Sequence, residues 1–157
     1  MIISPKRIVQ EGIVKDIDNP TEQIQQNWID LTLRTIEYMN TTDPLILTKG
    51  ERKNQSRIVI EPDPEGMILL TPWIYDVTFN EYVIIPNGMC AQIVQRSTLN
   101  RMWNFITAGL YDAWFENRVG AILHVNQEMT IEIWVRLAQI VFFEAEEGDL
   151  YNGIYKV

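Results

Sequence analysis

Four short polar clusters interrupt the apolar runs of this chain and carry the side chains best suited to chemistry. They centre on Asp30, on Arg96-Ser97-Thr98, on Asp112 and on the stretch from Arg136 to Gln139. Carboxylates can accept protons, whereas arginine, hydroxyl and amide groups can donate hydrogen bonds to anions. The glycine-rich phosphate loops and the serine and metal-histidine motifs of common enzymes are absent from the sequence. Any catalysis would therefore depend on carboxylates.

The chain has one His and one Cys, and neither is expected to be catalytic. His124 lies in an apolar run, where a strand histidine satisfied by one hydrogen bond is the common case. Cys90 stands between Met89 and Ala91 and is expected to be a small buried apolar residue. A single Cys cannot form an internal disulfide, and one His with one Cys cannot complete a structural zinc site.

Strands must position the four polar clusters. Runs rich in Ile, Val, Thr and aromatic residues recur at close spacing between turn residues, at 28–38, 56–60, 67–70, 73–79, 82–85, 89–94, 104–111, 120–125, 129–134 and 137–143. This spacing is typical of a sandwich or barrel and predicts an all-β fold. Ser4, Pro5 and Gly12 predict a short N-terminal helix before the strands, and the polar stretch 19–27 is expected to be a loop.

Two of these runs carry further information. Ile29, Leu31 and Leu33 alternate with polar residues, which predicts that Asp30 lies beside the apolar face and not in it. The run 140–143 is apolar on both faces, which in so small a β domain indicates a packed helix or a subunit interface.

Composition limits the functional classes. With 157 residues, 46% of them hydrophobic, the chain is expected to form a single domain over 1–157. The formal net charge of −8 disfavours nucleic-acid binding. The sequence has neither an apolar stretch approaching 18 residues nor a signal-like N-terminus, so we expect no membrane association and a cytoplasmic location.

The order of the four clusters resembles the motifs of the trimeric dUTPase and dCTP deaminase superfamily. The matching segments are QNWIDLTL (26–33), QRSTL (95–99), AGLYDAWF (108–115) and RLAQIV (136–141). The N-terminal helix and the ending LYNGIYKV look more like deaminase-type and archaeal-type members. The resemblance implies a dUTPase-like β-barrel of jelly-roll type, assembled as a homotrimer that shares its sites between subunits.

The resemblance also implies an activity, the Mg²⁺-dependent hydrolysis of dUTP to dUMP and pyrophosphate. Asp112 would be the base that activates water, and Asp30 would help to hold Mg²⁺ through water. Phe115 would lie against the deoxyribose and exclude a 2′-hydroxyl. The other implied substrate-binding residues are Arg96, Ser97, Thr98 and Gln139, then Gly109, Leu110 and Tyr111 near the pyrimidine, and Tyr151, Tyr155 and Lys156 in the tail.

One residue separates hydrolase from deaminase in this superfamily. The deaminases need a Glu on the strand after the third motif, and the two ways of counting from Asp112 arrive at Ile122 or Val125. Glu116 lies in an apparent insertion and is expected to be a solvated loop residue. This favours dUTP hydrolysis over dCTP deamination. The alternatives are a dCTP deaminase or bifunctional deaminase-diphosphatase, and a non-catalytic relative that binds nucleotide or a protein partner.

Overall fold

The computed structural model describes residues 1–148, so Tyr151, Tyr155 and Lys156 lie outside the described residues. Short helices occupy α1 (Pro5–Gln10), α2 (Pro20–Gln23) and α3 (Ser97–Arg101). The strands are β1 (Val14–Lys15), β2 (Ile29–Met39), β3 (Ile46–Leu47), β4 (Arg52–Lys53), β5 (Arg57–Val59), β6 (Met67–Leu70), β7 (Trp73–Ile84), β8 (Met89–Gln95), β9 (Phe105–Thr107), β10 (Leu110–Tyr111), β11 (Glu116–Val125), β12 (Met129–Glu132) and β13 (Arg136–Glu144). Within 1–148, no helix has the length and apolar character to cross a membrane.

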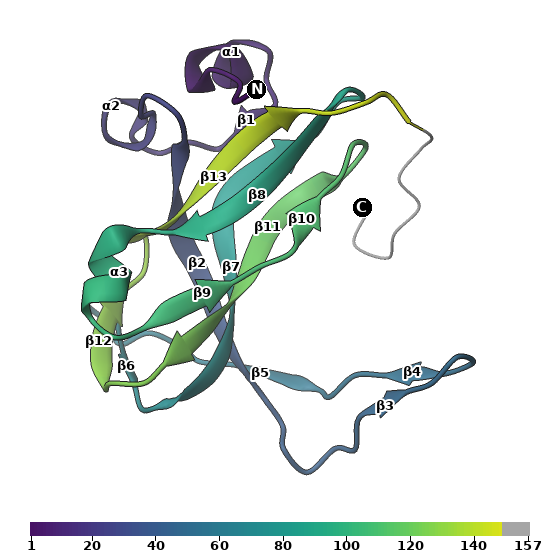
Figure 1. The fold of residues 1–157 in the computed structure, drawn as a ribbon. Coiled ribbons are helices and arrows are strands. Elements are labelled where there is room, and N and C mark those ends of the chain that lie inside the picture. Colours follow the sequence, from purple (N-terminus) through teal and green to yellow (C-terminus); the bar gives the residue numbers. More distant parts are fainter. Residues whose placement is uncertain (149–157) are drawn as a thin grey trace.

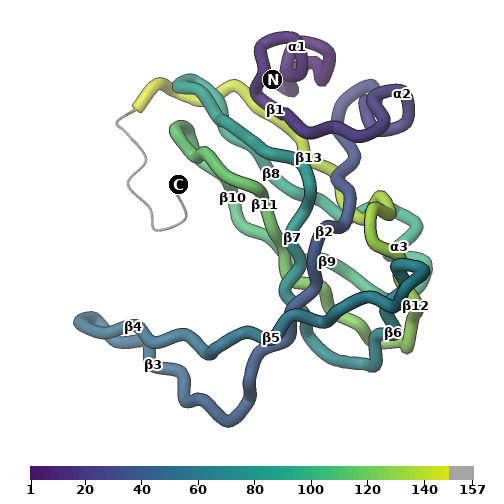
Figure 2. The backbone as a smooth tube through the Cα atoms, turned by 180° about the vertical axis from the view of Figure 1, so that it is seen from behind, coloured from purple at the N-terminus to yellow at the C-terminus, as the bar shows by residue number. Residues whose placement is uncertain are grey.

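One curled antiparallel sheet dominates the molecule (Figures 1 and 2). Its strand order is β10-β8-β13-β2-β7-β11-β9, with β1 added to β7 and β5 added to β2. Strand β9 at one end of this order lies close to β8 near the other end, and the Ile106 N–H in β9 donates to Gln95 Oε1 in β8 at 2.9 Å. The pair β3–β4 projects from this body as an arm (Figure 1). The predicted all-β fold with a short N-terminal helix is confirmed.

Alternation along the central strands builds the core. Tyr75, Val77 and Phe79 of β7 are buried, and Leu123 of β11 is fully buried. Burying a large apolar side chain stabilises the fold by about 1.5–3 kcal/mol. Residues between these positions, such as Asp76, point to the other face of the sheet, where side chains are available for a site.

Polar residues inside strands caused two errors in the predictions made from the sequence. The runs 73–79 and 82–85 form the single strand β7, because Asn80 and Glu81 between them are buried and hydrogen-bonded. Glu81 Oε1 accepts from Thr32 Oγ1 and from Gln23 Nε2, each at 2.7 Å. Asp30 was expected beside the apolar face, but it is 2% exposed. Both faces of this part of β2 are therefore buried, and the polar side chains on one of these faces form hydrogen bonds with polar partners.

Other boundaries also differ from the expectations. The run 104–111 is divided into β9 and β10, and the stretch 19–27 contains α2, which Asn19 caps by accepting from the Glu22 N–H. Glu116 is not in a loop: it begins β11 opposite Ile84 of β7 and accepts a hydrogen bond from a tyrosine of that strand. Regular pairing with β7 therefore accommodates most of the apparent insertion, residues 115–119, with a bulge between 118 and 120.

The two special residues, His124 and Cys90, gave different outcomes. His124 is hydrogen-bonded to Thr107 Oγ1 at 2.9 Å and stacks on Phe105, as expected for a strand histidine satisfied by its neighbours. Cys90 is half-buried, so the expectation of a buried residue was wrong.

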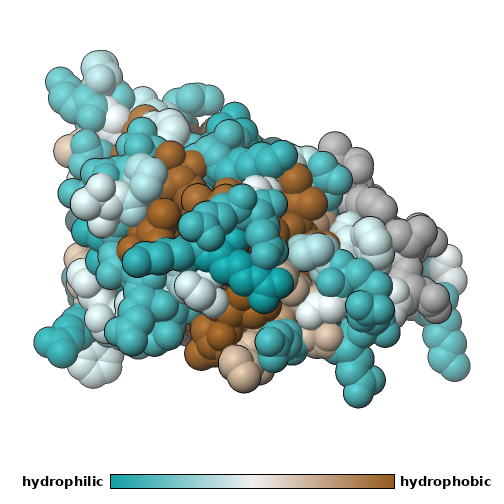
Figure 3. Space-filling model, turned by 90° about the horizontal axis from the view of Figure 1, so that it is seen from above, coloured by the Kyte–Doolittle hydropathy of each residue, from teal (hydrophilic) through white to brown (hydrophobic). Residues whose placement is uncertain are grey.

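Apolar surface remains exposed on the chain. Apolar side chains are visible between polar ones on the end of the molecule seen in Figure 3. Among the individual residues, Trp103 is 82% exposed and Leu110 is 61% exposed. A contiguous exposed apolar patch can mark a surface that contacts another protein, whereas apolar side chains exposed singly are normal.

Gly120 permits a close approach between β11 and β7, which leads to a testable consequence. A Cβ at this position would lie 2.8 Å from the carbonyl oxygen of Val77, a backbone atom that cannot move easily. We expect Gly120→Ala to lower the free energy of unfolding by about 1–3 kcal/mol, measured by urea denaturation. Gly50→Ala is the control, because a Cβ there meets no atom within 4 Å. Equal stability of the two variants would contradict the close approach.

Candidate functional site

The predicted site residues fall into two groups on one chain. The first is the Asp30 cluster, which comprises Asp30 of β2, Arg136 and Gln139 of β13, and Arg96 between β8 and α3. Asp30 and Gln139 are directly opposite each other in the pairing of β2 with β13. Asp30 Oδ2 lies 3.2 Å from Arg136 Nη1 and 3.8 Å from Arg96 Nε. Three sequence motifs distant along the chain thus meet at one end of the sheet.

The Asp30 cluster has an excess of positive charge. Burial raises the pKa of Asp30, and the nearby Arg96 and Arg136 guanidinium groups oppose this rise. Two arginines around one carboxylate leave one positive charge, and both arginine side chains are partly exposed. Ser97 and Thr98, which follow Arg96, are also exposed. Guanidinium and hydroxyl groups together are well suited to bind the oxygens of an anion.

The contacts of Asp30 do not fit a metal ligand. Its carboxylate accepts from Arg136 and from Trp28 Nε1 at 3.1 Å, and its side chain is 3% exposed. Across residues 1–148, no three or more His, Cys, Asp or Glu side chains lie together as a metal site. A carboxylate already bound by two cations is a poor partner for a hydrated Mg²⁺ ion.

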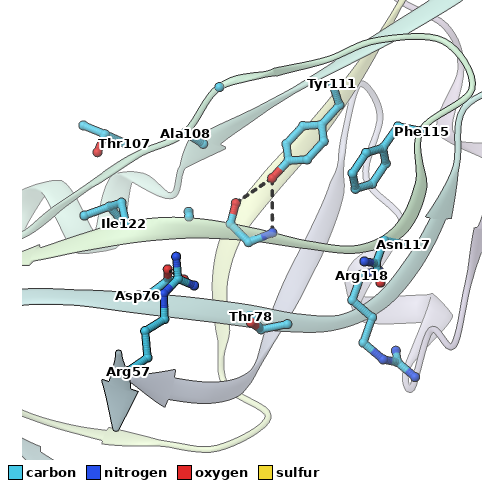
Figure 4. Close-up of a pocket in the computed structure, with 13 residues that line it drawn as sticks. Arg57, Asp76, Thr78, Thr107, Ala108, Tyr111, Phe115, Asn117, Arg118 and Ile122 are labelled. Carbon is cyan, nitrogen blue, oxygen red and sulfur yellow. Dashed lines mark hydrogen bonds and ion pairs between the residues drawn. The ribbon is translucent and has the colours of Figure 1, made fainter. Parts of the chain in front are cut away.

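The second group lines a pocket of about 340 Å³ between β10, β11 and β7, which we call the hairpin pocket (Figure 4). The Tyr111 hydroxyl donates to the Gly120 carbonyl at 2.7 Å and accepts from the Gly120 N–H at 3.2 Å. These bonds fix β10 against β11. Gly109 also lines the pocket, while Leu110 is exposed beside it.

Phe115 and Asp112 lie on either side of the turn that leads into β11. Phe115 lines the hairpin pocket, is 3% exposed, and packs edge-on against Tyr111 with 4.8 Å between ring centroids. Asp112 is exposed, and its carbonyl accepts from the Phe115 N–H at 3.2 Å. The turn therefore holds an exposed carboxylate between two aromatic residues that line the pocket.

Sequence reasoning missed the charged residues that line the hairpin pocket, which are Arg57 of β5, Asp76 of β7 and Arg118 of β11. Arg57 Nη1 lies 2.6 Å from Asp76 Oδ2. Burial raises the pKa of Asp76, and the charge of Arg57 opposes this. Ile122, which also lines the pocket, is directly opposite Asp76 in the pairing of β11 with β7. The alternation around Asp76 could have placed it on a polar face, but only the pairing of β2, β5 and β7 brings Arg57 to it.

The hairpin pocket and the Asp30 cluster are separate within one chain. None of Arg96, Ser97, Asp30 or Gln139 is among the residues that line the pocket. The described chain therefore presents a positively charged group suited to anions and a separate pocket of about 340 Å³.

Comparison with known proteins places these features in a family. The family described as dCTP deaminase-like matches residues 4–145. A probable deoxyuridine 5′-triphosphate nucleotidohydrolase of Methanosarcina mazei is 32% identical over 146 residues, which cover 89% of this chain and 84% of the relative. A deoxyuridine 5′-triphosphate nucleotidohydrolase of Methanocaldococcus jannaschii is 31% identical over 137 residues, which cover 86% and 88%.

A solved structure shares the fold. The 2′-deoxycytidine 5′-triphosphate deaminase of Agrobacterium tumefaciens superposes with a TM-score of 0.69 at 15% sequence identity. The match covers 92% of this chain but 48% of that one, so the present chain spans about half the length of that deaminase. At this identity the likeness concerns the fold alone.

Proposed function

The chain belongs to the dCTP deaminase-like family, and within this family we propose that it is a dUTP diphosphatase. Such an enzyme hydrolyses dUTP to dUMP and pyrophosphate. The names of relatives more than 30% identical over most of their length support this activity. The observation that decides between hydrolase and deaminase is Ile122. It lines the hairpin pocket at one of the two positions where a deaminase of the family needs a proton-transferring Glu, whereas Glu116, which begins the same strand, is not among the residues that line the pocket. Asp76 opposite it is engaged by Arg57 at 2.6 Å.

The two groups of residues would divide the substrate between them. The nucleoside occupies the hairpin pocket, and the triphosphate is bound by Arg96, Ser97, Thr98 and Gln139. Strand β10 lies at one end of the described sheet order, and its Tyr111 lines the hairpin pocket. Backbone N–H and C=O groups of the Leu110-Tyr111 strand are the kinds of group that would match the alternating acceptors and donor of uracil. Phosphoryl chemistry requires positioned donors on the phosphate oxygens, which Arg96, Ser97, Thr98 and Gln139 would supply.

Asp112 would act as the base. It accepts a proton from the water whose oxygen attacks phosphorus, while the bond to the departing pyrophosphate breaks. Its exposed position on the turn beside the hairpin pocket leaves the carboxylate accessible to such a water. Phe115, held by Tyr111, would limit the space on the sugar side and exclude a 2′-hydroxyl.

We also propose that Mg²⁺ accompanies the triphosphate. When bound, the ion neutralises phosphate charge, and it prefers oxygen ligands including water. Since the contacts of Asp30 do not suit a metal ligand, we assign Asp30 to positioning Arg96 and Arg136 and give it no step that involves the metal.

A homotrimer would join the two groups. In a symmetric assembly, the hairpin pocket of one chain can face the Asp30 cluster of the next. The separation of the two groups on one chain supports this arrangement.

An assay on two nucleotides tests the proposed function. The protein is incubated with dUTP and with dCTP in the presence of Mg²⁺, and both pyrophosphate and deaminated base are measured. We expect pyrophosphate from dUTP and no deamination of dCTP. Deamination would favour the deaminase or bifunctional alternative. Binding without turnover of either nucleotide would favour a non-catalytic relative.

A further inference from the structure

One wall of the hairpin pocket carries a charged group that the proposed reaction does not use. Figure 4 shows the side chain of Arg57 extending from β5 to Asp76 at this wall. Arg57 Nη1 lies 2.6 Å from Asp76 Oδ2 and 3.9 Å from Glu37 Oε2. The Arg57 side chain is 42% exposed, compared with 28% for Glu37 and 14% for Asp76. The guanidinium is thus the most accessible member of the group.

The charge of this group indicates which part of a nucleotide it would contact. Arg57 with Asp76 and Glu37 leaves one negative charge, whereas the Asp30 cluster leaves one positive charge. A triphosphate is attracted to the second group and repelled by the first. The group around Arg57 therefore suits an uncharged polar edge, such as that of a pyrimidine base.

We propose that Arg57 reads the 4-position of the pyrimidine and selects the carbonyl of uracil over the amino group of cytosine. This inference deepens the proposed function and rests on it. A guanidinium has five N–H donors and no acceptor. It can donate to O4 of uracil while Nη1 remains on Asp76. The 4-amino group of cytosine is itself a donor, so with cytosine the two groups would face each other unpaired.

Asp76 is the positioning residue in this arrangement. Glu37 and Asp76 are directly opposite each other in the pairing of β2 with β7. Opposed like charges in a sheet are unfavourable, and Arg57 from β5 offsets them by reaching both. The two carboxylates in return restrict Arg57 to the pocket wall. A carboxylate alone would give the opposite preference, because it accepts hydrogen bonds and would favour the cytosine amino group.

The test compares two nucleotides and two readouts. kcat/KM for pyrophosphate release is measured with dUTP and dCTP, and equilibrium binding is measured with dUMP and dCMP. Arg57→Met is expected to lower the dUTP value by about ten- to a hundredfold and to leave the dCTP value unchanged or raised, because Asp76 can then accept from the cytosine amino group, so that the preference disappears or reverses. Asp76→Asn is expected to reduce the preference in the same direction but less. Arg52→Met, on the exposed strand β4 of the arm, is the matched control.

Each outcome has a defined meaning. An equal loss on both nucleotides, or a preference for uracil that rises in Asp76→Asn, would overturn the role of Arg57. If Arg57→Met does not fold, the double variant Glu37→Gln with Arg57→Met removes one of the two opposed carboxylates and carries the same test. Failure of the parent protein to hydrolyse dUTP would reject the proposed function instead, while the dUMP and dCMP binding ratio would still test the inference.

Discussion

Asp112→Asn is expected to lower the turnover of dUTP by about a hundredfold or more, the usual scale for the loss of a positioned general base. The amide keeps the shape of the carboxylate but cannot take the proton from water. Because the Asp112 side chain is exposed, the substitution should leave folding unchanged. The measurement is the steady-state kcat for pyrophosphate release, together with the thermal unfolding midpoint.

A matched surface carboxylate provides the control for this variant. Asp18 is exposed and lies far from Asp112 in the sequence. Asp18→Asn is the same replacement as Asp112→Asn, so it changes the net charge equally. We expect Asp18→Asn to keep the parental kcat. Binding of dUMP should be nearly the same in both variants and in the parent. If Asp112→Asn retains close to the parental rate, Asp112 is not the base and the assignment of 108–115 to the third motif is wrong.

The fold could be predicted from sequence because periodicity reports which face of a strand is apolar. The segments 67–70 and 89–94 were found almost to the residue for this reason. Periodicity failed at Asn80 and Glu81, whose polarity resembles a turn. Their hydrogen bonds to Thr32 and Gln23 come from distant segments, and no local pattern contains them.

The same distinction applies to the candidate site. Asp30, Arg96 and Gln139 could be grouped because they lie in ordered motifs, and the structure brings them together. Arg57 and Asp76 belong to no motif and are 19 positions apart in sequence. They meet because β5 and β7 both pair with β2. A contact of this kind depends on register, which a single sequence does not specify at a strand so short as β5.

Two inactive variants are expected to restore activity when their chains assemble together. The first is Asp112→Asn, which damages the side of the site formed by the hairpin pocket. The second combines Arg96→Met with Ser97→Ala, which damages the Asp30 cluster and its neighbouring hydroxyl while Arg136 still partners Asp30. If each site takes its pocket from one chain and its cluster from the next, a mixed trimer contains some sites with both halves intact.

The amount of restored activity follows from random assembly. With equal amounts of the two variants, half of the pockets and half of the clusters are intact, so about a quarter of the sites are complete. The two proteins are mixed in urea, refolded together and assayed for pyrophosphate release from dUTP, and light scattering reports the assembly state. A mixture of the Arg96→Met/Ser97→Ala variant with Gln139→Ala is the control. Both of its members are defective in the same half, so it should regain no activity.

A stable monomer with full activity in the parent, or no restoration in verified mixed assemblies, would show instead that the site lies within one chain. The separation of the hairpin pocket from the Asp30 cluster would then have to be closed by a rearrangement of that chain alone.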